Sequence, residues 1–179
     1  TAPQYGGTIT LNMWWTTGVN DPYFGYAFSN LFGVVEKLGI GNWGIDRDEW
    51  DFKSGPTPVS AMTGWLAESW DISPDGLTYT FHIRQGVHWH NKAPMNGREL
   101  TAEDIEYNFH RLLGMGKFAD AGPTPFGGAA HLTSIPFESI TATDKWTVVM
   151  KLTELNLGAL RLILIDGMTY IMPPEVIEQ

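Results

Sequence analysis

The chain has 179 residues, of which 43% are hydrophobic and 17% charged, a composition typical of a folded globular domain and not of a disordered chain. Its 20 acidic and 11 basic residues give a net charge of −9, which opposes binding to nucleic acid or to an anionic membrane surface. The absence of cysteine excludes disulfides, thiolate metal ligands and cysteine nucleophiles. No apolar run reaches the length of about 18 residues that a membrane span requires.

The N-terminal third predicts a strand, a helix and a loop. Residues 8–13 alternate in polarity and are rich in β-forming types, which indicates a strand. Asp21 and Pro22 have the types expected where a helix begins, and an apolar stripe extends that predicted helix to about Leu38. Residues 39–58 show no periodic pattern, so we expect a long surface loop there.

The middle and the end of the chain predict antiparallel strands. Turn-forming sequences of the types Ser-Pro-Asp-Gly and Gln-Gly separate three β-rich runs, at residues 64–70, 77–83 and 87–90. A hairpin is expected from residues 139–143 and 147–152, which flank an Asp-Lys turn. The first three runs predict a small antiparallel sheet.

Helices are expected at two further places. Thr101 and Asp104 resemble a capping box in front of an apolar stripe, which predicts a helix over residues 102–113 that ends at a glycine. Residues 157–165 form a short apolar helix or a buried strand, two alternatives that the pattern leaves open. The Pro-Pro pair at 173–174 begins one further element.

One ordered set of motifs resembles a known family. The motifs occur in a fixed order. LAESW comes first, then a polar turn, and then TYTFH followed by a hydrophobic residue and an arginine. A tryptophan, the pair Asn-Gly and the run LTAED, itself followed by a hydrophobic residue, complete the pattern. It resembles that of the family 5 extracytoplasmic solute-binding proteins of ABC importers, which include oligopeptide- and dipeptide-binding receptors. The resemblance extends over nearly the whole chain, and the sequence departs from the family mainly by its excursion at 39–59 and inserted residues at 90–95. The matching residues are 66–70, 77–84, Trp89, Asn96, Gly97 and 100–105.

This resemblance implies a mixed α/β (α+β) fold, with a small antiparallel sheet and packed helices. It implies the N-terminal lobe, with its extra subdomain, of a two-lobed periplasmic binding protein. Residues 1–20 would supply the first strand and the cleft-lining exit of lobe I, 21–156 the extra subdomain, and 157–179 a return segment toward lobe I. Because family members are much longer, we expect a fragment without the second lobe.

The implied function is capture of a peptide or a similar small solute outside the cytoplasmic membrane, for delivery to the membrane subunits of an ABC permease. Oligosaccharides and metal chelates remain open as solutes. The location would be periplasmic or at the cell surface, with a lipid anchor in a full-length precursor left open. No cofactor is expected. The sequence lacks G-x-S-x-G, H-E-x-x-H and phosphate-loop motifs, so we predict that the chain is not an enzyme.

The ligand-binding residues implied by the resemblance are Trp14, Trp15 and Thr16, which follow the first predicted strand where the family's chain lines the cleft. Aromatic walls with a few polar groups are typical of ligand sites. The other tryptophans have structural interpretations. Core packing is expected of Trp65, Trp70, Trp89 and Trp146, and a satellite cluster under the loop is expected of Trp43 and Trp50.

Two clusters have the residue types of metal ligands, but we favour no metal site. His88 and His90 would share one side of a predicted strand, with His82 not far away, yet no third ligand follows by spacing. The acidic run at 46–49 lacks the central glycine and the distal glutamate of a calcium loop, so a solvated acidic loop is favoured.

An alternative function belongs to a different class of protein. Eight tryptophans and an aromatic content of 13% are compatible with a freestanding aromatic-rich carbohydrate-binding module. Such a module would present a flat, exposed row of tryptophan rings to a polysaccharide. The ordered motifs favour the solute-binding protein over this module.

Overall fold

The computed structural model describes residues 35–53, 55–125, 131–165 and 169–178. The strand predicted at 8–13 and most of the following predicted helix lie outside these residues. The described elements are the strands β1 (Gly39–Gly41), β2 (Met62–Gly64), β3 (Ala67–Ile72), β4 (Thr78–Ile83), β5 (Phe137–Asp144) and β6 (Thr147–Leu152), the helices α2 (Ala102–Leu113), α4 (Ala159–Ile165) and α5 (Pro174–Ile177), and 3-10 turns at Val59–Ala61 and Gly116–Phe118.

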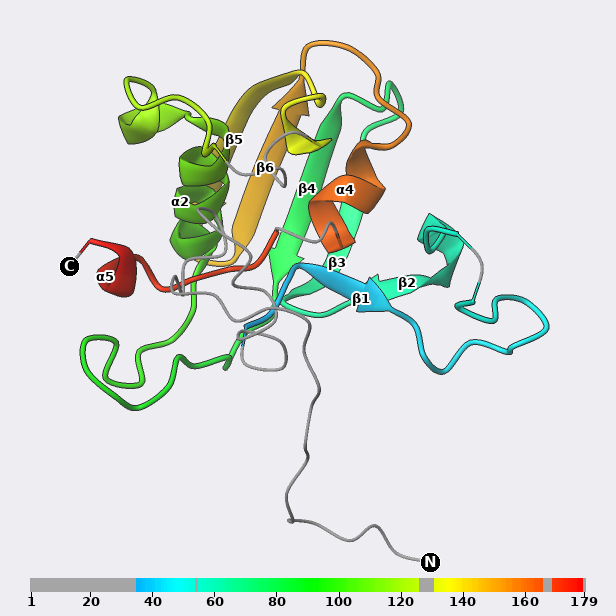
Figure 1. Ribbon diagram of the computed structural model, residues 1–179, viewed down its shortest axis with the longest axis horizontal. Helices are drawn as coiled ribbons and strands as arrows, with labels where there is room; N and C mark the ends of the chain where they lie inside the picture. Colours follow the sequence, from blue (N-terminus) through cyan, green and yellow to red (C-terminus); the bar gives the residue numbers. More distant parts are fainter. Residues whose placement is uncertain (1–34, 54, 126–130, 166–168, 179) are drawn as a thin grey trace, which may run out of the picture.

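The main sheet has four antiparallel strands in the order β3-β4-β6-β5 (Figure 1). Successive side chains of a strand point to opposite faces, and in β4 every second residue, from Tyr79 to Ile83, is buried. The neighbouring β6 repeats this alternation with Val148, Met150 and Leu152. One face of the sheet is therefore apolar and covered, while the other carries polar side chains, as an antiparallel sheet allows.

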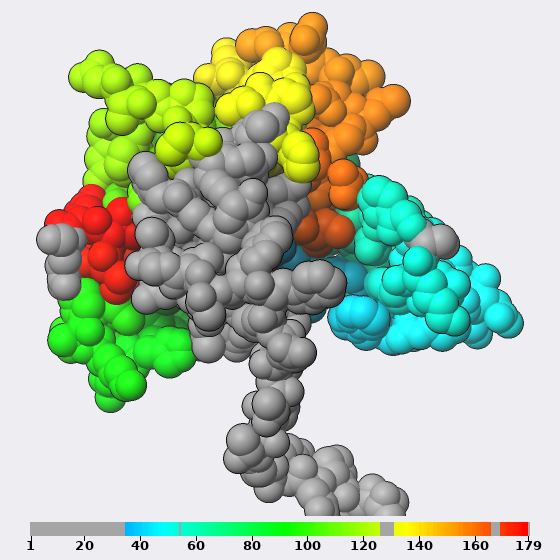
Figure 2. Space-filling model, in the orientation of Figure 1, coloured from blue at the N-terminus to red at the C-terminus, as the bar shows by residue number. Residues whose placement is uncertain are grey.

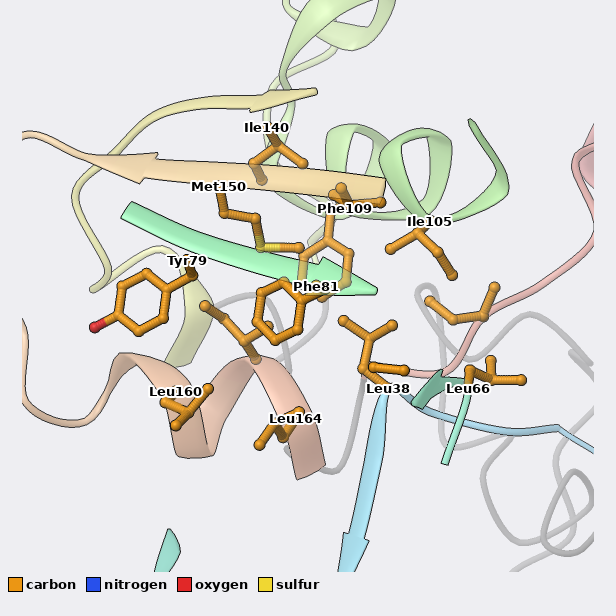
Figure 3. Close-up of a cluster of buried hydrophobic side chains, with 14 of the residues drawn as sticks. Leu38, Leu66, Tyr79, Phe81, Ile105, Phe109, Ile140, Met150, Leu160 and Leu164 are labelled. Atoms are coloured by element: carbon orange, nitrogen blue, oxygen red, sulfur yellow. The ribbon is translucent and has the colours of Figure 1, made fainter. Parts of the chain in front are cut away.

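Helices α2 and α4 supply the cover for the apolar face (Figure 1). Phe109 of α2 and Leu164 of α4 belong to the same buried cluster as Phe81, Ile140 and Met150 of the sheet (Figure 3). The predicted fold class, a small antiparallel sheet with packed helices, is confirmed. Residues 157–165 form a helix at their C-terminal end, which decides between the two alternatives left by the sequence.

Helix α2 begins and ends where the sequence predicts. The backbone N–H of Thr101 donates to Oδ2 of Asp104 at 3.0 Å, and the two residues form a capping box. The helix ends at Gly114, whose φ of 67° is a left-handed conformation that glycine adopts without steric cost. A Cβ at this position would also lie 2.2 Å from the backbone of Gly122.

Replacement of Thr101 by alanine is expected to lower the free energy of unfolding by about 1 kcal/mol, because the helix loses its N-cap side chain. Chemical denaturation of the 179-residue chain would measure this change. Thr101→Ser keeps the hydroxyl and serves as the matched control, with a midpoint near that of the unmodified chain. Equal midpoints for Thr101→Ala and the unmodified chain would contradict the cap assignment.

The predicted end of the first helix, just before β1, is wrong. The apolar stripe predicts helix up to Leu38, but Glu36 forms an antiparallel bridge with Ile171 and accepts its N–H at 2.9 Å. The carbonyl of Leu38 accepts the N–H groups of both Trp65 and Ala67. Pairing with distant segments therefore overrides the helical pattern here, since a sequence window does not contain the partner strand.

Three strand boundaries also differ from the prediction. The run 64–70 is divided, because β2 ends at Gly64 and β3 begins at Ala67. The predicted loop at 39–58 begins with β1, which pairs with β2. Residues 87–90 form no strand, and an isolated bridge joins His88 to Glu99. Within the described ranges, no helix has both the length and the apolar character needed to cross a bilayer.

Candidate ligand-binding site

The predicted cleft residues Trp14, Trp15 and Thr16 lie outside the described residues. Their role stays a prediction from the sequence. The described part of the chain contains other features with the chemistry of a binding site.

A hollow of about 450 Å³ opens beside β1. Its walls come from segments far apart in the chain: Trp43 and Phe52 from the β1–β2 connection, Trp65 from the β2–β3 connection, and Tyr170 from the segment after α4. The side chain of Lys37 lies at its edge, with Nζ 4.4 Å from the centroid of the Tyr170 ring. A concave, mostly apolar wall that includes four aromatic side chains and one cation has the make-up of a small-molecule site.

The described residues of the β1–β2 connection, 42–53 and 55–61, project from one side of the molecule and are coloured cyan in Figure 2. Within it, the rings of Trp43 and Phe52 stack with centroids 4.5 Å apart, and Trp50 meets Phe52 edge-on at 6.4 Å. The predicted satellite cluster of Trp43 and Trp50 is confirmed. Arg47 also belongs to this cluster, which the sequence did not indicate. Its guanidinium lies 5.0 Å from the centroid of the Phe52 ring and donates to the carbonyl of Trp43 at 3.0 Å.

The four tryptophans predicted to pack in the core divide into two pairs. Trp70 and Trp89 are half-buried and pack against the main cluster, as predicted. Trp65 instead lines the hollow beside β1. Trp146 is half-buried at the β5–β6 turn, where Nζ of Lys145 lies 4.5 Å from its ring centroid. The core interpretation is wrong for this second pair, because both residues sit in connections outside the covered face of the sheet.

A network of charges joins the segment before α2 to the end of the chain. Arg98 contacts Asp104 through two hydrogen bonds, of 2.7 and 2.8 Å, and holds Glu175 with Nε and Nη2. Asp104 is buried and also accepts from the backbone of Thr101 and from Nε1 of Trp89. The hydrogen bonds that Arg98 donates to Glu175, and then those to Asp104, raise the pKa of Arg98 further above its usual range. All acceptors are satisfied internally, so this network anchors structure and is not an open ligand site.

The buried amide of Asn108 strengthens the same junction. Its Nδ2 donates to the carbonyl of Met172 at 2.8 Å, and its Oδ1 accepts the N–H of Met172 at 3.0 Å. One side chain on α2 thus satisfies both backbone groups of a residue far along the chain, much as a neighbouring strand would. The sequence offers no local signal for this contact or for the Arg98–Glu175 pair, because the partners are separated by 64 and 77 residues.

Two of the histidines considered as metal ligands have hydrogen-bond partners within the protein. His82 pairs with Asp71 at 2.8 Å, and Nδ1 of His88 bonds the carbonyl of Gly97. The expectation that His88 and His90 share one side of a strand is wrong, since residues 87–90 form no strand. In the part of the chain that the structure describes, no three His, Cys, Asp or Glu side chains come together in a metal-binding arrangement.

The acidic run in the β1–β2 connection forms a turn. Oδ1 of Asp46 accepts the N–H of Asp48 at 2.9 Å, and its carbonyl accepts the N–H groups of Glu49 and Trp50. The acidic side chains of this run are exposed. They are therefore solvated charges around a local turn, in agreement with the favoured interpretation.

The fold and the ordered motifs agree with a known family. Residues 61–174 match the family model described as bacterial extracellular solute-binding proteins, family 5 Middle. This match includes β2 to β6, α2 and α4, and covers more than half of the chain. The chain belongs to this family.

Curated relatives within the family are named for peptides. The chain is 52% identical over 62 residues to the dipeptide-binding protein of Escherichia coli K12, a match that covers 34% of this chain and 11% of that protein. It is 38% identical over 111 residues to di/tripeptide-binding protein 1 of Pseudomonas aeruginosa, covering 59% of this chain and 20% of that protein. The chain therefore matches only a small part of the length of these relatives.

A solved structure shows the same fold. The ABC transporter-associated periplasmic binding protein DppA from Helicobacter pylori, in complex with the peptide STSA, superposes with a TM-score of 0.63 at 27% identity. The superposition covers 88% of this chain and 29% of that protein. The family membership and the fold support the solute-binding interpretation, and they do not support the carbohydrate-binding module.

Proposed function

We propose that this chain is part of the substrate-binding component of an ABC importer, which captures a peptide or a similar small solute for delivery to a membrane permease. The observation that carries this proposal is the family match over residues 61–174. The names of the relatives support di- and tripeptides as the solute class. Haem is a second candidate, since the chain is also 44% identical over 64 residues to heme-binding protein A of Haemophilus influenzae.

The domain assignment is part of the proposal. Residues 1–20 would supply the first strand and one wall of the cleft, 21–156 the extra subdomain, and 157–179 the return toward lobe I. Support comes from the sheet and α2, which form one covered core inside the middle segment. Helix α4 of the return segment packs into this same core through Leu160 and Leu164. The ligand would be enclosed between lobes by a hinge motion that the ligand favours.

Solute capture requires no covalent chemistry, and we propose that the chain has no catalytic role. The family is one of solute-binding proteins. The charged networks of the described residues, at Arg98 and at Asp46, have structural explanations. The family description also supports an extracytoplasmic location for the protein.

The test is a calorimetric titration of the natural protein that carries this sequence, with di- and tripeptides, haem and a soluble oligosaccharide as separate ligands. We expect stoichiometric binding of peptides, with a Kd of about 1 μM or below. Haem binding without peptide binding would contradict peptides as the solute class, but it would agree with the proposed role in transport. Binding of the oligosaccharide alone would contradict the proposal.

The role of the predicted cleft residues is tested in the same protein. Trp14→Ala and Trp15→Ala are expected to weaken peptide binding about tenfold or more while leaving the melting temperature nearly unchanged, because an aromatic wall contributes contact area to the ligand. Trp146→Phe, at the β5–β6 turn, is the matched control and should bind as the unmodified protein does. Unchanged binding by both alanine variants would remove these residues from the site.

A further inference from the structure

The two edges of the main sheet differ in how they are protected. β3 and β5 are the outer strands of the described sheet, and an outer strand presents N–H and C=O groups that a second chain can bond. In β3, the exposed charges of Glu68 and Asp71 and an irregular register near its start oppose such pairing. In β5, residues 139–143 form the run Ser-Ile-Thr-Ala-Thr, which carries no charge and is rich in β-branched types. The edge of β5 therefore requires a different protection.

Two side chains of α2 cover this edge. The helix lies beside β5 (Figure 1). Oε2 of Glu106 accepts the N–H of Ala142 at 2.8 Å, and Nε2 of His110 lies 2.8 Å from the carbonyl oxygen of Ile140. A carbonyl oxygen can only accept, so Nε2 carries a proton and is the donor. Both side chains are largely buried, so these contacts are shielded from water.

The two contacts have the pattern of a strand pair. In a parallel pair, one residue donates its N–H to a carbonyl of the neighbouring strand and accepts the N–H that lies two residues further along that strand. Glu106 and His110 are four residues apart on one face of α2, and they supply this donor and this acceptor to Ile140 and Ala142. They therefore occupy the backbone groups through which a further strand would bind.

The segment after α2 helps to hold the His110 ring. Gly116 has a φ of 53°, and a Cβ at this position would lie 2.6 Å from Nδ1 of His110, closer than real contacts permit. Glycine therefore lets the backbone pass directly against the ring, where it restricts movement of the ring away from β5. Nδ1 also lies 3.8 Å from Oε1 of Glu106, so the two side chains support each other.

We propose that Glu106 and His110 guard the edge of β5 against strand pairing with a second copy of this chain. A second copy carries the same uncharged run at the same edge, so two such runs can pair without opposed charges at their centre. Loss of both side chains leaves the carbonyl of Ile140 and the N–H of Ala142 free for this pairing. Glu138 and Asp144 at the ends of β5 would meet acids of the other copy, so the pairing is weak. The proposal is independent of the transport function.

Sedimentation velocity of the 179-residue chain that carries both Glu106→Ala and His110→Ala tests the proposal. We expect the average mass of this double variant to rise about twofold, toward that of a dimer, between about 5 and about 200 μM. The unmodified chain should keep one mass over this range. Hydrogen exchange followed by mass spectrometry should show the β5 amides of the double variant better protected at the higher concentration. A folded double variant of constant mass, or equal association by the unmodified chain, would overturn the proposal.

Further variants separate edge pairing from a general loss of stability. Thr101→Ala weakens the same helix but keeps both edge contacts, so it should stay monomeric. Ala142→Pro, added to the double variant, removes the N–H that a second copy would bond, and proline is tolerated on an edge strand where that N–H faces outward. This triple variant should return to the mass of the monomer.

Far-UV circular dichroism verifies the fold of each variant. The single variants Glu106→Ala and His110→Ala each free one backbone group, so they should associate more weakly than the double variant, and they provide the same test if the double variant does not fold. Association by folded Thr101→Ala equal to that of the Glu106 and His110 variants would show that loss of stability alone causes it. That result would overturn the proposal, as would a dimer that persists in the folded triple variant.

Discussion

Replacement of Phe109 by alanine is expected to lower the free energy of unfolding by about 3–5 kcal/mol. The Phe109 side chain is 1% exposed and points from α2 toward the sheet, into the cluster that contains Phe81 and Met150 (Figure 3). Truncation removes apolar contacts and leaves a cavity, because α2 is held at both ends by its capping box and by Gly114 and cannot readily move inward. This is the largest single-residue effect that we expect in the core.

Urea denaturation of the 179-residue chain, followed by circular dichroism, would measure the change. Glu103→Ala on the exposed face of the same helix is the matched control, and its effect should stay within about 0.5 kcal/mol. Phe109→Leu keeps part of the volume and should fall between the two variants. An effect of Phe109→Ala as small as that of Glu103→Ala would show that α2 does not cover the sheet through this face.

Replacement of Arg98 by methionine is expected to lower the free energy of unfolding by about 2–3 kcal/mol at neutral pH. This effect is smaller than that of breaking a fully buried ion pair, because 33% of the Arg98 side chain is exposed. The variant leaves Asp104 buried without its cation. It also disconnects Glu175, and hence α5, from the segment before α2. Arg98→Lys keeps the charge but cannot form both paired contacts, so an intermediate effect is expected.

The pH dependence of this variant follows from Glu175. The hydrogen bond from Arg98 lowers the pKa of Glu175, so the folded state favours the ionised carboxylate. This contribution to stability is present above the ordinary glutamate pKa and is lost as the pH falls through the lowered value. Arg98→Met removes the contribution, so the stability difference from the unmodified chain should shrink between about pH 5 and pH 3. Denaturation of the variant and of the unmodified chain at several pH values in this range would measure the difference in their free energies of unfolding. A difference that does not change with pH would contradict the link between Arg98 and Glu175.

Local patterns in the sequence were sufficient for the elements whose causes are local. Helix α2 carries its own start and stop signals, in Thr101, Asp104 and Gly114, and an apolar stripe between them. The turn between β3 and β4 forms as expected, with the N–H of Gly76 donating to the carbonyl of Ser73 at 2.8 Å. In these cases the interacting groups are only a few residues apart, so the sequence contains both partners.

The candidate sites show the opposite case. Clustering of Trp43 and Trp50 was predictable because both lie in one connection, whereas the hollow also needs Lys37 and Tyr170, which are brought together only by folding. Neither Arg98 nor Asn108 stands out in the sequence, although both hold the end of the chain against α2. Charge and size alone do not reveal which distant group a side chain will meet.

By itself, the sequence determined the family, the capped helix and the hairpins. Only the tertiary structure decided that Glu36 pairs with Ile171 instead of lying in a helix, that the run 64–70 divides between β2 and β3, and that an aromatic hollow forms beside β1. The physical reason is the range of the interactions. Caps, turns and alternation depend on neighbours in the chain, whereas strand pairing and pocket walls depend on backbone and side-chain partners that lie many residues away.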